Sequence, residues 1–171
     1  MNSNICDFVE YLLQSLCENK ENIKIKESVD EKGKLIEKNP TNVVVDCGGV
    51  GYEINISMHT FSMLPEQDFL KIYTHLQVKE DAHTLFGFIE KSEREIFRLL
   101  ISVSGIGTNI ARIMLSSLTP KQIQQAIAVG DVATIQSIKG IGAKTAQRVI
   151  LDLKDKVLKI YGIDEVSDAV N

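Results

Sequence analysis

The second half of the chain contains the same short pattern twice, and the two copies lie 35 residues apart. The first copy occupies residues 101–111 and the second residues 136–146. Each copy reads as the end of a helix, then Gly-Ile-Gly, then the start of a new helix. Glycine allows a tight turn with a positive φ angle and lets another backbone approach closely. The intervening isoleucines, Ile106 and Ile141, are expected to pack inward, so the repeat predicts two similar hairpins that each join a pair of helices.

Each predicted hairpin would present backbone N–H groups at the start of the helix that follows it. Such a helix start attracts anions through its amides and its dipole, and a DNA phosphate is a suitable ligand. A single Gly-x-Gly is more often an ordinary tight turn, whereas two matched copies between helices favour the helix–hairpin–helix motif. Basic residues flank the second copy and extend the expected contact. The predicted phosphate-binding residues are Gly105, Ile106, Gly107, Asn109, Lys139, Gly140, Ile141, Gly142, Lys144, Thr145 and Arg148.

The net charge of −4 is distributed unevenly along the chain. Residues 1–90 carry 8 lysines and 15 acidic residues, a net charge of −7, whereas residues 91–160 carry a net charge of +6. The last eleven residues add −3. This asymmetry indicates a nucleic-acid-binding face confined to the part of the chain that contains the hairpins. Because backbone amides carry no information about bases, the expected binding is selective for DNA structure rather than for sequence.

The part of the chain before the hairpins has a different pattern. Residues 1–30 form an atypical N-terminal extension, in which a helix is predicted over residues 3–18. Residues 31–90 are predicted to contain five short strands, over 34–38, 42–47, 52–57, 69–78 and 84–89. Short strands separated by glycine-rich turns favour a small closed barrel, for which the OB-fold is the candidate.

Residues 91–162 are predicted to be helical, and residues 163–171 to form an acidic tail or the start of a linker. The expected helices cover 92–103, 109–118, 120–129, 132–138 and 143–161. The predicted fold class is therefore α+β and multidomain, with an OB-fold barrel followed by an all-α tandem helix–hairpin–helix domain.

No catalytic residue, metal site or cofactor is predicted. The three cysteines lack metal-ligand spacing and are expected to be free thiols in a reducing compartment, which indicates a cytoplasmic protein. No apolar run reaches the roughly 18 residues that a membrane span requires. The stretch 140–145 superficially resembles a nucleotide-binding loop, but it lacks the Gly-Lys-Ser/Thr ending and a preceding strand, so ATP binding is rejected.

These features together resemble the RuvA family, the junction-recognition subunits of the bacterial Holliday-junction branch-migration complex. The resemblance covers about three-quarters of the chain, from Gly33 to Tyr161. Besides both hairpins, it rests on the segments 33–40, 48–53, 73–75, 80–82 and 85–88.

The resemblance implies a non-catalytic subunit that forms a four-fold symmetric homotetramer and holds four-way junction DNA open and flat during recombination and repair. It implies a separate RuvB-type ATPase motor and a RuvC-type resolvase as partners. It also implies that an acidic pair on a barrel hairpin, Glu80 and Asp81 here, projects at the tetramer centre as a pin. Carboxylates among phosphates repel the DNA backbones and help to keep the strands apart at the crossover. Whether one tetramer or an octamer of two stacked tetramers assembles is left open.

The sequence departs from the family pattern at three places. About 30 residues precede Gly33, so the first barrel strand is either supplied by residues 23–29 or the barrel edge is altered. The chain stops where the family continues into a third, motor-docking domain, which argues against motor engagement. The first hairpin has Thr108-Asn109 where the family commonly has Pro-Lys, which weakens its side-chain contact with phosphate. Two rival hypotheses stay open: a structure-specific helix–hairpin–helix DNA repair enzyme, and a truncated assembly subunit that cannot recruit the motor.

Overall fold

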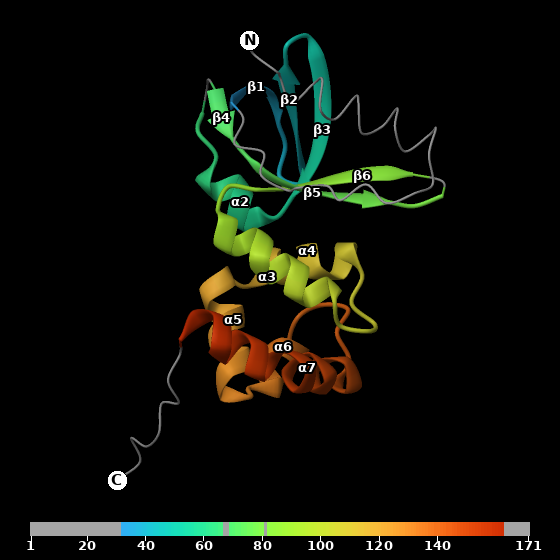
Figure 1. Cartoon of the computed structure of the whole chain (residues 1–171), viewed down its shortest axis with the longest axis vertical. Helices are drawn as coiled ribbons and strands as arrows, with labels where there is room; N and C mark the ends of the chain where they lie inside the picture. The colour runs from blue at the N-terminus through green and yellow to red at the C-terminus, as the bar shows by residue number, and fades with distance from the viewer. Residues whose placement is uncertain (1–31, 67–68, 81, 163–171) are drawn as a thin grey trace. The chain divides into compact units, whose positions relative to one another are not determined.

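The computed structural model describes residues 32–66, 69–80 and 82–162 (Figure 1). Contacts between residues divide the chain into two compact units. The barrel unit comprises the described residues up to Ile56 together with Thr60–Glu90, and the helical unit comprises Ser57–His59 together with the described residues from Lys91 onward.

The barrel unit is built on one six-stranded sheet. Its strands are β1 (Lys32–Lys38), β2 (Asn42–Cys47), β3 (Val50–Ile56), β4 (Phe69–Lys71), β5 (Tyr73–Val78) and β6 (His83–Phe88). They lie in the order β4-β1-β2-β3-β6-β5, and every neighbouring pair is antiparallel except β3 and β6. Only Ile72 separates β4 from β5 in the chain, yet these two strands occupy opposite ends of the sheet. The sheet must therefore curl round on itself, which is the arrangement of a small OB-type barrel.

Apolar residues from the inner faces of the strands fill the barrel. Val43 and Val45 on β2, and Ile54 and Ile56 on β3, are buried and alternate with more exposed neighbours. This alternation is expected where one face of a strand lies on a core. At Gly87 of β6, a Cβ atom would lie 2.5 Å from the Ile54 Cγ2 atom, so no side chain fits at that point.

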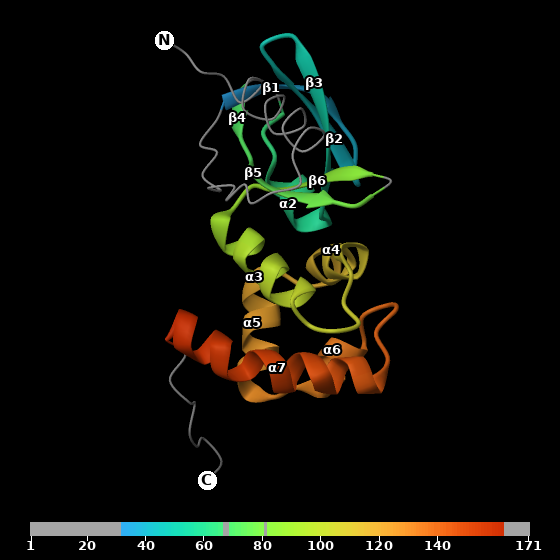
Figure 2. The same ribbon diagram turned by 45° about the vertical axis from the view of Figure 1, so that its right-hand side comes forward.

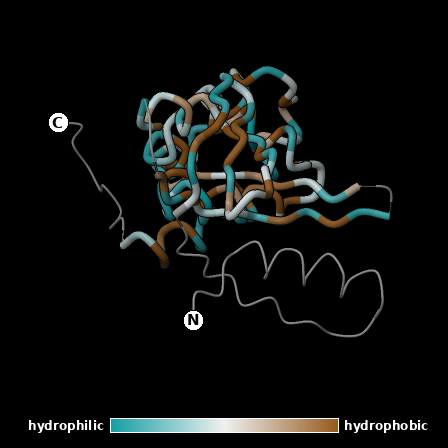
Figure 3. Tube along the Cα trace, turned by 90° about the horizontal axis from the view of Figure 1, so that it is seen from above, coloured by the Kyte–Doolittle hydropathy of each residue, from teal (hydrophilic) through white to brown (hydrophobic). Residues whose placement is uncertain are grey.

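Strands β5 and β6 form a hairpin that extends from the barrel. Their residues pair from Tyr73 with Phe88 to Val78 with His83. The tip is closed by the Lys79 N–H, which donates a hydrogen bond of 2.9 Å to the Ala82 carbonyl. Polar and apolar residues alternate along this ribbon (Figure 3), as expected of an extended hairpin with two different faces.

Five helices of the described chain lie wholly within the helical unit: α3 (Lys91–Ile101), α4 (Thr108–Ser117), α5 (Pro120–Val129), α6 (Val132–Gln136) and α7 (Ala143–Tyr161). The short helix α2 (Met58–Met63) begins in the segment Ser57–His59 of the helical unit and continues into the barrel unit. The long helix α7 packs against α5 and α6 (Figure 2). The core is formed by side chains that are fully or almost fully buried: Ile96, Phe97, Leu100, Met114, Leu115, Ile123, Ile127, Ile135, Val149, Leu153 and Val157.

Two of these helices, α5 and α6, have a side-chain N-cap. Helix α5 begins with a capping box, in which the Gln122 N–H donates to the Thr119 hydroxyl and the Thr119 N–H donates to the Gln122 side chain at 2.9 Å. Helix α6 begins with Asp131, whose carboxylate accepts a hydrogen bond of 3.0 Å from the Thr134 N–H. Hydrogen bonds from the Thr134 side chain and backbone hold the pKa of the Asp131 carboxyl below its ordinary value.

The α+β class predicted from the sequence is confirmed, and the predicted bounds of α5 and α7 coincide with the observed ones. One predicted strand was wrong in its extent, and one helix was missed. The strand predicted over 69–78 is interrupted at Ile72, where the chain bends to close the sheet, and the helix α2 was not predicted. A helix of six residues is too short to show a clear apolar period.

The first barrel strand begins at Lys32, and its residues Lys32–Lys34 pair with β4. The first strand of the barrel thus contains Gly33, and it lies between β4 and β2 in the sheet. The alternative strand over residues 23–29, and the helix predicted over residues 3–18, lie outside the described residues. Across the described ranges, none of the helices has both the length and the apolar character needed to cross a bilayer.

Candidate nucleic-acid interface

The two Gly-Ile-Gly segments fold into hairpins with almost the same backbone. Hairpin I (residues 103–107) has Gly105 at φ +96° and Gly107 at φ −84°, ψ 168°. Hairpin II (residues 138–142) has Gly140 at φ +91° and Gly142 at φ −85°, ψ 166°. A repeat that was visible only as a sequence pattern is therefore also a repeat of geometry, to within a few degrees.

The isoleucine of each hairpin stabilises the turn through a backbone hydrogen bond and a buried side chain. The Ile106 N–H donates to the Val103 carbonyl at 3.0 Å, and the Ile141 N–H donates to the Ile138 carbonyl at 3.1 Å. The side chains of Ile106 and Ile141 are only 5% and 6% exposed. Both residues had been predicted among the phosphate-binding set, but their amides are used within the turn and their side chains are buried. They therefore support the hairpin, and their contact with phosphate stays a prediction.

The two glycines of each hairpin have different structural roles. Gly105 and Gly140 adopt a positive φ, which side-chain-bearing residues rarely do. Gly107 and Gly142 have ordinary extended angles, and a Cβ atom added to either would meet no atom of the described chain within 4 Å. Nothing in the fold of the helical unit requires glycine at these second positions. Their side-chain-free surface faces outward, at the starts of α4 and α7.

No side chain caps the start of α4 or the start of α7. The first helical hydrogen bonds come from the Ala111 N–H to the Gly107 carbonyl and from the Ala146 N–H to the Gly142 carbonyl, both at 2.9 Å. Amides earlier in each first turn have no partner within their own helix. Neither Gly107 nor Gly142 supplies a side-chain cap, in contrast to Thr119 at the start of α5. These two helix starts are suited to an external anion.

The two hairpins lie next to each other. In Figures 1 and 2 the loop from α3 to α4 and the loop from α6 to α7 are on the same side of the helical unit. An atom-level contact agrees with this view, because a Cβ atom on Gly140 would lie 3.3 Å from the Cδ1 atom of Ile110 in α4. This contact brings hairpin II against α4, and no pattern in the sequence singled out Ile110 for this role.

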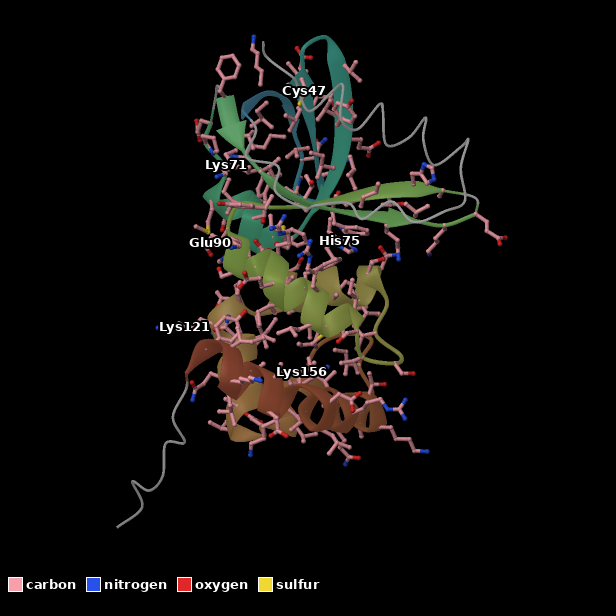
Figure 4. All side chains as sticks on the ribbon, viewed as in Figure 1. Cys47, Lys71, His75, Glu90, Lys121 and Lys156 are labelled. Atoms are coloured by element: carbon pink, nitrogen blue, oxygen red, sulfur yellow. The ribbon has the colours of Figure 1, made fainter. Side chains whose placement is uncertain are left out.

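The polar side chains of the predicted set surround these helix starts. Asn109, Lys139, Lys144 and Arg148 are exposed, and Thr145 is half-buried. Lys144 and Arg148 are four residues apart on α7, so they project from one face of the helix. Not every cation of the basic segment serves this surface, since Figure 4 shows Lys121 at the side of the helical unit away from the hairpins.

The predicted acidic pin is described only in part. Glu80 is exposed at the tip of the β5–β6 hairpin, directly after the closing residue Lys79. Asp81 lies outside the described residues. In Figure 4, His75 lies on β5, where its strand partner is Phe86. The described part of the chain contains no group of three or more His, Cys, Asp or Glu side chains that could hold a metal ion.

A curled OB-type barrel in one unit and two helix–hairpin–helix motifs in the other are typical of a class of DNA-binding proteins. Comparison with known families specifies this class further. The family described as RuvA N terminal domain matches residues 31–87, and the family described as SAM-like helix-hairpin-helix tandem matches residues 97–155.

The same result comes from individual relatives, each of which is named Holliday junction branch migration complex subunit RuvA. The relative from Christiangramia forsetii is 73% identical over 135 residues, which cover 79% of this chain and 70% of the relative. The relative from Flavobacterium psychrophilum is 69% identical over 136 residues, covering 80% of this chain and 70% of the relative. The relative from Bacteroides fragilis is 48% identical over 126 residues, covering 74% and 63%. The chain belongs to the RuvA family.

Proposed function

We propose that the chain is a non-catalytic DNA-binding subunit that recognises four-way junctions and holds them open for branch migration in recombination and repair. The observation that carries this proposal is the pair of hairpins with matching backbone angles, each followed by an uncapped helix start. The names of the relatives add the type of DNA, because each is a subunit of a Holliday junction branch migration complex.

The proposed contact is made first by the backbone. Amides at the starts of α4 and α7 donate to phosphate oxygens, and the second glycine of each hairpin, Gly107 or Gly142, leaves room for the phosphate to approach. Asn109, Lys139, Lys144, Thr145 and Arg148 add side-chain donors around these two sites. Two amide sites at a fixed spacing select the course of a DNA backbone and not its bases, which fits the recognition of a DNA structure.

The proposed acidic pin consists of Glu80 and Asp81 on the β5–β6 tip. Exposed carboxylates there would repel phosphates and keep the separated strands apart near the crossover. This role requires several chains around one junction, so it is joined to the proposal that the chain forms a homotetramer. A tetramer built from four copies would place four pins at the centre and four pairs of hairpins along the arms.

The proposed partners are a RuvB-type ATPase motor, which would supply ATP hydrolysis from a separate chain, and a RuvC-type resolvase. We propose that the protein is cytoplasmic, where Cys47, a half-buried thiol that forms no disulfide in the structure, would stay reduced. We keep in this proposal the organisation inferred from the sequence. It consists of an N-terminal extension (residues 1–30), a barrel domain (31–90), a helix–hairpin–helix domain (91–162) and an acidic tail or linker start (163–171).

The proposal is tested by a gel-shift titration of the whole chain against a synthetic four-way junction and a linear duplex of matched sequence. We expect a preference for the junction, seen as a slowly migrating multimer, and an affinity that falls steeply with salt. Equal affinity for both DNAs would reduce the protein to a general DNA binder and overturn the junction proposal. Incubation of labelled junctions with magnesium alone separates the enzyme alternative, because a repair nuclease would cut the DNA and a non-catalytic subunit leaves it intact.

A further inference from the structure

The two hairpins have almost the same backbone, but the side chains around them differ in charge. With the 35-residue offset of the repeat, residues 102–113, which include hairpin I and the start of α4, correspond to residues 137–148, which include hairpin II and the start of α7. Ser104 corresponds to Lys139, Asn109 to Lys144, and Ile113 to Arg148. Three positions that carry cations around hairpin II are therefore uncharged around hairpin I.

The cations of hairpin II are available for an external ligand. Lys139, Lys144 and Arg148 are all exposed, and no carboxylate within the described residues forms an ion pair with any of them. Around hairpin I, the single cation between residues 102 and 113 is Arg112, which is partly buried and already engaged in an interaction within the protein. The difference in charge is thus not compensated by another exposed cation in the corresponding segment.

We infer that the two hairpins bind DNA phosphates unequally: hairpin II is an electrostatic anchor, and hairpin I is a neutral guide that binds through backbone amides and hydroxyl or amide side chains. This inference rests on the proposed function. Cations that neutralise phosphates release counterions and make affinity depend on salt, whereas a hydrogen bond from a neutral amide does so far less. The salt dependence of binding is therefore expected to come mainly from the cations of hairpin II. The DNA strand at hairpin I is held by neutral hydrogen bonds, which act only at short range.

An exchange of side chains between corresponding positions tests the division of roles. Lys139→Ser with Lys144→Asn gives hairpin II the residues of hairpin I, and Ser104→Lys with Asn109→Lys gives hairpin I the residues of hairpin II. All four positions are exposed, so neither exchange disturbs the core. A control variant, Lys121→Ser with Lys156→Asn, removes two exposed lysines elsewhere in the helical unit. Lys156 is twelve residues beyond Lys144 on α7, and this separation is about 18 Å along the helix axis.

The dissociation constant for the four-way junction is measured at about 50 mM and about 200 mM salt, and the ratio of the two values is compared between variants. Each phosphate contact made by a cation contributes a slope of about 0.9 to the dependence of log affinity on log salt, so two lysines change this ratio about tenfold per bound chain. We expect the ratio to fall by that factor for the hairpin II variant and to rise by it for the hairpin I variant. The variant with all four substitutions should return close to the ratio of the natural chain, and the control should differ from it far less than either exchange.

The gain expected for Ser104→Lys with Asn109→Lys is the decisive result, because damage to the fold cannot produce tighter, more salt-dependent binding. An unchanged ratio in this variant would show that the corresponding side chains of hairpin I do not face DNA and would overturn the inference. An unchanged ratio in the hairpin II variant would overturn it as well. The affinities of the natural chain for the junction and for the duplex are measured in the same experiment, and they test the proposed function separately. A preference for the junction would persist even if the exchanged side chains left the salt dependence unchanged.

Discussion

Substitution of the two glycines in hairpin II by alanine should affect different properties of the protein. Gly140 has a φ of +91°, and its Cβ atom would also lie 3.3 Å from the flexible end of Ile110. A left-handed conformation costs a residue with a side chain about 1–2 kcal/mol. Gly142 has a φ of −85° and open space around the position of a Cβ atom, so alanine is accommodated there. Alanine at such a site lowers the entropy of the unfolded chain and stabilises by about 0.4–1 kcal/mol.

DNA binding should respond in the opposite way to the Gly142→Ala substitution. In the proposed complex, the added methyl group stands where a phosphate approaches the amides at the start of α7. Loss of one hydrogen bond to a charged group costs about 1.5–3 kcal/mol, and this corresponds to a decrease in affinity of at least about tenfold. Gly142→Ala is therefore expected to yield a protein that is at least as stable as the natural chain but binds the junction more weakly.

The free energy of unfolding, from denaturant titration, and the junction affinity, from a gel shift, should be measured for both variants. Gly105→Ala and Gly107→Ala in hairpin I provide a matched pair, with the difference that no atom lies within 4 Å of a Cβ atom at Gly105. The reasoning is refuted if Gly142→Ala loses as much stability as Gly140→Ala, because glycine would then be required by the fold at both positions. It is also refuted if Gly142→Ala binds the junction as tightly as the natural chain.

Three further substitutions test features that position the hairpins and the barrel. Thr119→Ala removes the capping box of α5 and should lower the free energy of unfolding by about 1 kcal/mol, measured by denaturant titration; a loss below a few tenths would contradict the role of this cap. Gly87→Ala introduces a Cβ atom 2.5 Å from Ile54 Cγ2 and 2.6 Å from Ile72 Cδ1, and overpacking of this kind should cost about 1–3 kcal/mol in a thermal or denaturant titration. Asp131 has a lowered pKa in the folded chain, so its contribution to stability is complete above the pKa of the unfolded chain and is lost as the pH falls through the folded pKa. We therefore expect the difference in free energy of unfolding between the natural chain and Asp131→Asn to decrease as the pH falls through that range. If denaturant titrations gave a difference that does not change with pH, the titration of Asp131 would not be its cause.

The sequence predicted most of the helical unit because its helices carry local signals. Thr119-Pro120 starts α5, Gly130 ends it in a left-handed conformation, and the predicted and observed bounds agree. The repeat of Gly-Ile-Gly also predicted the buried isoleucines correctly. Local signals could not show that the amides of Ile106 and Ile141 donate hydrogen bonds within the turn.

Features that depend on distant parts of the chain were not predictable in the same way. The break at Ile72 separates β4 from β5 because the sheet closes there, and closure involves strands far apart in sequence. The contact between Ile110 and the Gly140 position joins two motifs and has no periodic pattern of its own. The two glycines of a hairpin can be distinguished only by their backbone angles in the structure, since both positions look the same in the sequence.

The distribution of helix caps gives the strongest physical argument for the interface. Within one helical unit, α5 and α6 are capped by Thr119 and Asp131, whereas α4 and α7 begin with glycines that offer no side-chain cap. Side-chain caps are thus available to helices of this chain, and α4 and α7 begin without them. The starts of α4 and α7 follow the repeated hairpins, and a Cβ atom at Gly107 or Gly142 would meet no described atom within 4 Å. A phosphate bound there takes the place of the missing cap, so DNA binding and the stability of the first turns of α4 and α7 should be linked: ligand that binds only the folded hairpins must stabilise them.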